Sequence, residues 1–281
     1  MTELTVSADW LKERLGDPRV KIVDASWYLA AQKRDGKAEY LAGHIPGAVF
    51  FDIDAIADHS TDLPHMLPDP AAFAAAAGAL GLSESDTIVV YDGLGLFTAP
   101  RVWWTLKVFG ANDVRVLEGG LPAWKGAGLP LQSGAVKPKQ ALFSATFSPK
   151  MVRSFDEVRA HLTARDAAIV DARAAARFRG EAPEPRPGLA SGHMPGARNV
   201  PYDTLADDQG RLKPPNEIRK LFQDAGVDLS SPIVTSCGSG VTAAVLLFAL
   251  ARVGKFDVSI YDGSWTEWGS RADTPVATGP A

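Results

Sequence analysis

The stretch PIVTSCGSGVTAAVLLFAL, residues 232–250, predicts a buried strand, a glycine-bearing turn and an apolar helix in direct succession. The turn carries Cys237, the only cysteine among the 281 residues. Unpaired N–H groups at the start of a helix favour negative charge, so this position favours a thiolate. Gly238 and Gly240 keep side chains away from the turn, which a core cysteine does not need. We therefore interpret Cys237 as a reactive thiol rather than a small buried hydrophobe.

Four landmarks of the first half of the chain return in the second half in the same order and at a nearly constant separation. This repetition predicts two domains of one fold. The pairs are Ile22–Ala25 with Ile169–Ala172, Gly43–Ala48 with Gly192–Ala197, Ile88–Gly95 with Ile233–Gly240, and Glu118–Trp124 with Asp262–Trp268.

Each half alternates short apolar strands with helical stretches, which predicts an α/β fold: a mainly parallel sheet flanked by helices on both faces. We expect a first domain over residues 1–134, a linker over 135–149 and a second domain over 150–281. Asp92 occupies the position of Cys237 in the first half. A carboxylate cannot act as a sulfur nucleophile, so the first domain is predicted to be non-catalytic.

The composition excludes several classes of protein. A net charge of −4 argues against a nucleic-acid-binding surface, and a single cysteine excludes an internal disulfide, a cysteine-based zinc cluster and an internal resolving thiol. The N-terminus is acidic and no apolar run is long enough to span a bilayer, so we expect no membrane association and a cytoplasmic protein. No phosphate-binding or dinucleotide fingerprint is present.

Three classes of enzyme place a cysteine on such a turn. A cysteine phosphatase needs an arginine six positions after the nucleophile, where this chain has Ala243. A cysteine protease needs a histidine base near the thiol, which the sequence alone does not reveal. The third class is sulfur transfer, in which the N–H groups of the loop stabilise a persulfide anion.

The chain resembles the tandem rhodanese-type sulfurtransferases, and within them the 3-mercaptopyruvate sulfurtransferases, from Ile22 to Trp268. The most specific motif is the loop Cys237–Thr242. Relatives that prefer thiosulfate carry basic residues after the cysteine, whereas this loop has Gly238 and Ser239. The resemblance implies that the loop residues bind the donor and its sulfur: Gly238, Gly240, Val241 and Thr242.

The same resemblance implies further site residues. By position, Arg177 and Arg186 correspond to two arginines that hold the carboxylate and carbonyl of the donor, as guanidinium groups do well. A proton-handling group of Ser239, His44 and Asp35 is also implied. His44 has an alternative role in fixing a turn, because His193 repeats it in the second half.

The implied reaction moves sulfur from 3-mercaptopyruvate through a Cys237 persulfide to an acceptor, and releases pyruvate. The expected acceptor is a thiol, a dithiol such as reduced thioredoxin, or cyanide, and no cofactor or metal is expected. Two alternatives stay open: transfer from thiosulfate to cyanide, and a non-catalytic module that carries persulfide sulfur received from another protein.

Overall fold

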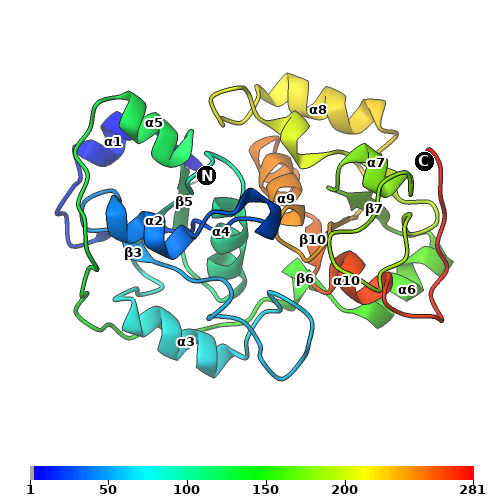
Figure 1. The fold of residues 1–281 in the computed structure, drawn as a ribbon, viewed down its shortest axis with the longest axis horizontal. Coiled ribbons are helices and arrows are strands. Elements are labelled where there is room, and N and C mark those ends of the chain that lie inside the picture. The colour runs from blue at the N-terminus through cyan, green and yellow to red at the C-terminus, as the bar shows by residue number, and fades with distance from the viewer. Residues whose placement is uncertain (1–2) are drawn as a thin grey trace. The chain divides into compact units, whose positions relative to one another are not determined.

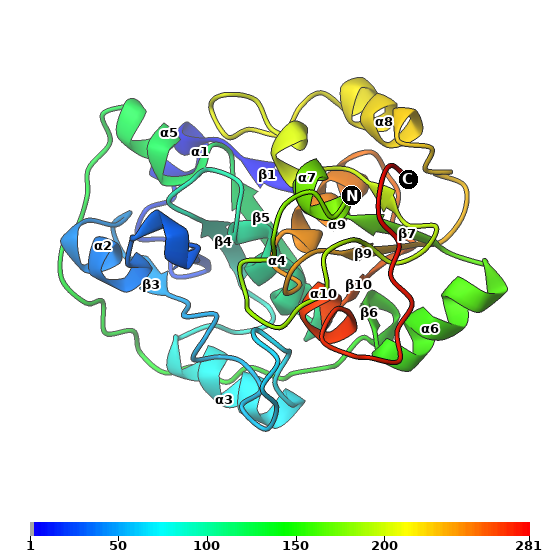
Figure 2. The ribbon, with the colours of Figure 1, turned by 45° about the vertical axis from the view of Figure 1, so that its right-hand side comes forward.

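The computed structural model describes residues 3–281, which divide into two compact units (Figures 1 and 2). The first unit comprises residues 3–58, 67–148 and 207–212, and the second comprises 59–66, 149–206 and 213–281. Residues 135–148 of the predicted linker group with the first unit, and the linker itself stays a prediction. A short segment of the first half, residues 59–66, belongs to the second unit.

The first unit is built on a five-stranded sheet in the order β1-β5-β4-β2-β3. Every neighbouring pair of strands is parallel. The strands are β1 (Thr5–Val6), β2 (Val20–Asp24), β3 (Val49–Phe50), β4 (Thr87–Tyr91) and β5 (Asp113–Leu117). The helices are α1 (Ala8–Lys12), α2 (Gly36–Ala42), α3 (Pro70–Ala79), α4 (Ala99–Val108) and α5 (Gly120–Gly126).

The second unit repeats this arrangement with the order β6-β10-β9-β7-β8, again with parallel pairs only. The strands are β6 (Val152–Arg153), β7 (Ala168–Asp171), β8 (Arg198–Asn199), β9 (Ile233–Ser236) and β10 (Val258–Tyr261). The helices are α6 (Phe155–Ala164), α7 (Ala175–Phe178), α8 (Pro215–Asp224), α9 (Ala243–Arg252) and α10 (Ser264–Trp268). The predicted α/β fold of two parallel sheets with flanking helices is confirmed.

Strand β9 and helix α9 of the second unit account for the apolar run around Cys237. The strand β9 is buried along its whole length, as expected for a parallel sheet covered on both faces. Helix α9 is buried from Ala243 to Ala251, so it is apolar on every side. The repeated tryptophans Trp124 and Trp268 are each fully buried in the core of their own unit.

Among residues 3–281, no helix combines the length and the apolar character needed to cross a membrane.

Candidate active site

Cys237 lies where β9 ends, at the first position of the loop that leads into α9. Cys237 is buried, with 2% of its surface exposed. The start of α10 holds this end of the loop through the backbone: the N–H of Cys237 donates to Oγ of Ser264 (3.2 Å), and the N–H of Trp265 donates to the carbonyl of Cys237 (3.0 Å). Thr266 binds the next carbonyl, that of Gly238, with both its N–H and its hydroxyl group. These bonds fix the sulfur at the carboxyl end of the central strand.

This arrangement leaves several N–H groups of the loop available. In the part of the chain that the structure describes, the N–H groups of Gly238, Ser239, Val241 and Thr242 donate to no other protein group. Gly240 has a φ of 77°, a left-handed conformation that favours glycine. Several free N–H groups beside a helix N-terminus form a site for an anion.

The equivalent loop of the first unit is filled by its own side chain. The carboxylate of Asp92, at the end of β4, is 1% exposed and accepts hydrogen bonds from five backbone N–H groups at 2.8–2.9 Å. Gly95 has a φ of 104° at the position that matches Gly240. The donors are the N–H groups of Leu94, Gly95, Phe97, Thr98 and Ala99.

The two predicted donor-binding arginines meet at the residue after the cysteine. A Cβ atom placed on Gly238 would lie 3.3 Å from Nη2 of Arg177 and 4.0 Å from Nη1 of Arg186. Arg177 comes from α7, and Arg186 follows it on a loop. The side chain of Arg177 is 23% exposed, so part of its guanidinium group is open to a ligand. Glycine at position 238 keeps the space between the loop and the two cations free.

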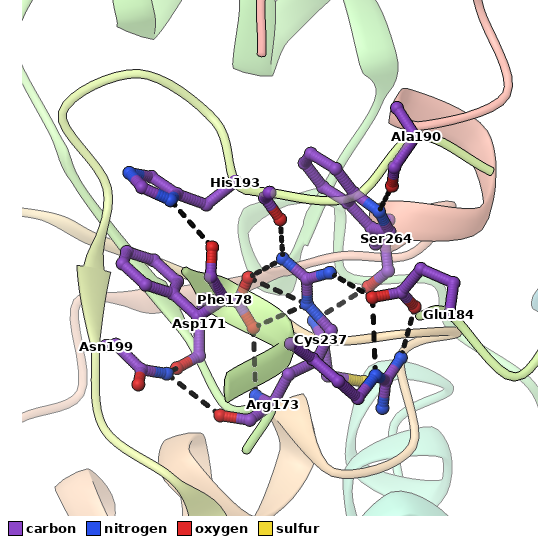
Figure 3. A network of polar contacts seen from close by, with 12 residues as sticks. Asp171, Arg173, Phe178, Glu184, Ala190, His193, Asn199, Cys237 and Ser264 are labelled. Atoms are coloured by element: carbon purple, nitrogen blue, oxygen red, sulfur yellow. Dashed lines mark hydrogen bonds and ion pairs between the residues drawn. The ribbon is translucent and has the colours of Figure 1, made fainter. Parts of the chain in front are cut away.

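A buried ionic network supports this arrangement (Figure 3). Arg173 donates to both carboxylate oxygens of Asp171, at the end of β7, and its Nη1 donates to Oε1 of Glu184 (2.7 Å). Its guanidinium group also stacks on Trp265, 4.3 Å from the ring centre. Burial lowers the pKa of Arg173, but the two carboxylates outweigh burial, and the pKa is raised overall. Arg173 therefore stays charged and joins β7, the loop after α7 and α10.

Ser239 has a histidine partner that the sequence analysis missed. Nδ1 of His65 and Oγ of Ser239 are joined by a hydrogen bond of 3.0 Å, and both residues are nearly buried. His65 lies in the segment 59–66, which belongs to the second unit, and has the left-handed φ of 63°. One signal was available in the sequence: His65, unlike His44, has no histidine counterpart in the second half.

The environments of His44 and Asp35 in the first unit are those of structural residues. His44 is fully buried, and its Nδ1–H donates to the carbonyl of Tyr40 (2.8 Å), whose ring it stacks on. His193 makes the same bond and the same stacking contact with Phe178 in the second unit. The carboxylate of Asp35 caps α2 by accepting from the N–H of Ala38. These contacts match the alternative role of His44, which is to fix a turn. Participation of His44 and Asp35 in proton transfer stays a prediction.

Comparison with known proteins identifies the family. The model of the Rhodanese-like domain matches twice, over residues 7–127 and 154–271. The chain is 49% identical to the 3-mercaptopyruvate sulfurtransferase of Escherichia coli K12 over 96% of both chains, and 45% identical to that of Homo sapiens over 95% of this chain and 92% of the human one.

Solved structures agree with the sequence comparison. The crystal structure of SseA, a 3-mercaptopyruvate sulfotransferase from Escherichia coli, superposes with a TM-score of 0.87 at 46% identity and covers 94% of this chain and 99% of SseA. Tum1 from Saccharomyces cerevisiae superposes with a TM-score of 0.90 at 33% identity and covers 100% of this chain and 99% of Tum1. The chain belongs to the rhodanese family and contains two Rhodanese-like domains.

Proposed function

We propose that this protein transfers sulfur from 3-mercaptopyruvate to a thiol or cyanide acceptor through a persulfide on Cys237. One observation carries the proposal: the loop that binds the Asp92 carboxylate in the first unit recurs in the second unit with a thiol in place of the carboxylate. Among the described residues, the N–H groups of Gly238, Ser239, Val241 and Thr242 in this second loop donate to no other protein group. A persulfide on Cys237 is an anion at the position equivalent to that of Asp92 in the first unit. The relatives named 3-mercaptopyruvate sulfurtransferases support the choice of donor.

The first half-reaction is a displacement at sulfur. The Cys237 thiolate attacks the sulfur of the donor, and the carbon–sulfur bond breaks with its electron pair moving to carbon. The products are a Cys237 persulfide and the enolate of pyruvate, which takes up one proton. The free N–H groups of the loop stabilise the persulfide anion.

Arg177 and Arg186 bind the donor in this proposal. Both guanidinium groups lie close to Gly238, beside the nucleophile, where a carboxylate and a neighbouring carbonyl can be bound together. Charge that develops on the enolate oxygen is stabilised by the same cations.

We assign proton transfer to Ser239 and His65, and a part for His44 and Asp35 stays a prediction. The 3.0 Å hydrogen bond between Ser239 and His65 supports this assignment, since it gives the hydroxyl group a base within reach. The fully buried His44 is bonded to Tyr40 instead.

In the second half-reaction an acceptor thiolate attacks the outer sulfur of the persulfide. The sulfur–sulfur bond breaks, the acceptor keeps the outer sulfur, and the Cys237 thiolate returns. The acceptor must be an external molecule because the chain holds no second cysteine. A reduced dithiol protein such as thioredoxin fits this requirement, and we place the reaction in the cytoplasm.

Thiosulfate is the second candidate donor, because a relative from Arabidopsis thaliana, 44% identical over 98% of this chain, is named "Thiosulfate/3-mercaptopyruvate sulfurtransferase 2". The test compares kcat/KM for the two donors with one acceptor, with Cys237→Ser as the blank. A preference for 3-mercaptopyruvate is expected. A preference for thiosulfate would reverse the order of the candidates. Activity with neither would leave a carrier that receives sulfur from another protein.

A further inference from the structure

We propose that Glu184 is a positioning residue that orients Arg177 toward the sulfur donor; this inference rests on the proposed function. In the proposed function Arg177 and Arg186 bind the donor, but donor binding alone does not explain how Arg177 keeps its orientation. Arg177 lies on α7, a helix of only four residues, and its long side chain needs a fixed partner to hold one rotamer.

Glu184 binds one edge of the Arg177 guanidinium group and leaves the other edge open. Nε of Arg177 donates to Oε1 of Glu184 (3.3 Å), and Nη2 makes a short hydrogen bond to Oε2. Among the described residues, Nη1 of Arg177 has no hydrogen-bond partner. The edge formed by Nη1 and Nη2 is therefore free for a carboxylate, and Nη2 is the atom that lies closest to the Cβ position of Gly238.

Glu184 is itself held firmly enough to act as a support. Its side chain is 2% exposed, and Oε1 also accepts from Nη1 of Arg173, which is anchored on Asp171. Pro183 and Pro185 flank it, and proline fixes the backbone φ angle. The carboxylate therefore joins a fully buried cation, Arg173, to a half-buried one, Arg177, whose free edge faces the donor site (Figure 3 shows the link from Arg173 to Glu184).

The proposal predicts a defect confined to the first half-reaction. In a ping-pong reaction, kcat/KM for the donor reports loading of Cys237, and kcat/KM for the acceptor reports discharge. Glu184→Gln keeps the shape of the side chain but loses the charge that holds Arg177. We expect kcat/KM for 3-mercaptopyruvate to fall about 100-fold, the effect of a misplaced binding group. We expect kcat/KM for the acceptor cyanide to stay unchanged.

Two control variants separate positioning from general damage. Glu181→Gln is the matched control, because Glu181 pairs with Arg179 on the exposed part of the same segment, and it should have no effect. In an Arg177→Ala background, Glu184→Gln should cause no further loss, because Glu184 acts through Arg177. Glu184→Asp keeps a charge beside Arg173 and should show the same selective defect if the glutamine variant does not fold.

A fall in kcat/KM for cyanide as large as that for the donor would overturn the proposal, because Glu184 would then support the Cys237 loop itself. A further loss in the Arg177→Ala background would overturn it too. If the unaltered protein turns over 3-mercaptopyruvate and both Glu184 variants match it, the positioning role alone fails. If the unaltered protein does not turn it over, the proposed function fails first.

Discussion

The loops after β4 and β9 occupy the same place in two copies of one fold, yet only the first binds an anionic side chain of its own. The Asp92 loop is closed on a carboxylate that belongs to the chain and satisfies five N–H groups. The Cys237 loop offers a thiol, and within residues 3–281 the N–H groups of Gly238, Ser239, Val241 and Thr242 donate to no other protein group. The difference teaches that the fold supplies an anion site at this turn, and that the residue at its first position decides whether the anion is permanent or formed during a reaction.

The ends of β2 and β7 differ in a related way. Asp24 and Asp171 are both buried at the last position of their strands. The residue two positions later is Ser26 in the first unit and Arg173 in the second. Burial raises the pKa of Asp24, and the nearby charge of Asp92 raises it further, although the Ser26 N–H donates to the carboxylate. Asp171 is instead paired with a buried cation, Arg173. At this position the second unit therefore has a buried network of charged side chains, whereas the first unit has the neutral Ser26.

The largest effect is expected for Cys237→Ser. The hydroxyl group cannot form a persulfide, so sulfur transfer should be lost completely. The measurement is turnover with 3-mercaptopyruvate together with the mass of the protein after exposure to the donor. Full turnover in this variant would mean that the Cys237 loop is no more catalytic than the Asp92 loop.

Arg186→Ala should lower kcat/KM for carboxylate donors, since a charge pair with the donor is lost. The loss of transition-state stabilisation should be about 2–4 kcal/mol. The surface arginine Arg179, which pairs with Glu181, is the matched control. Steady-state kinetics with both alanine variants makes the comparison. Equal kinetics for the two variants would remove Arg186 from the donor site.

Asp92→Asn tests the closed loop. An amide has only one oxygen to accept the hydrogen bonds that two carboxylate oxygens now accept, so the free energy of unfolding should fall by about 2 kcal/mol. Denaturant unfolding measures this loss. Loading of Cys237 with sulfur should continue under conditions in which the variant is folded. If loading stopped in the folded variant, Asp92 would have a part in catalysis that the comparison denies.

Asp24→Asn should have the smallest effect, which is an effect on the free energy of unfolding. The direction in which this effect changes with pH follows from the raised pKa of Asp24. Because the folded state raises the pKa of Asp24 above its usual 3.8, the folded state binds the proton more tightly than the unfolded chain does. Ionisation therefore weakens the fold as the pH rises above about 3.8, by at most about 1.4 kcal/mol for each unit of the raised pKa.

The asparagine variant should gain stability relative to the unaltered protein as the pH rises toward neutrality, and should match it below that range. Thermal unfolding across this pH range measures the difference. A relative gain on acidification instead would show that a cation lowers the pKa of Asp24.

The sequence predicted those parts of the fold and site that depend on neighbouring residues. The strand, turn and helix around Cys237 are contiguous, and the repeat fixed the equivalence with Asp92. Arg177 and Arg186 were predicted because they lie in one short segment that resembles known relatives, and the structure places both guanidinium groups near Gly238.

His65 and Glu184 were missed for physical reasons. His65 is 174 residues from Ser239 along the chain, in a segment that packs with the other half. No local pattern predicts a hydrogen bond over such a separation. In the sequence, Glu181 and Glu184 both lie between Arg177 and Arg186. Only the burial of Glu184 and its bonds to Arg173 and Arg177 distinguish it from the exposed Glu181.

The most direct test of the account is a single turnover without acceptor. The protein is mixed with an equimolar amount of 3-mercaptopyruvate, and both the pyruvate released and the mass of the peptide that contains Cys237 are measured. The account predicts pyruvate in an amount equal to the protein and the gain of one sulfur atom on Cys237. Release of pyruvate with no sulfur on Cys237, or no release of pyruvate at all, would contradict it.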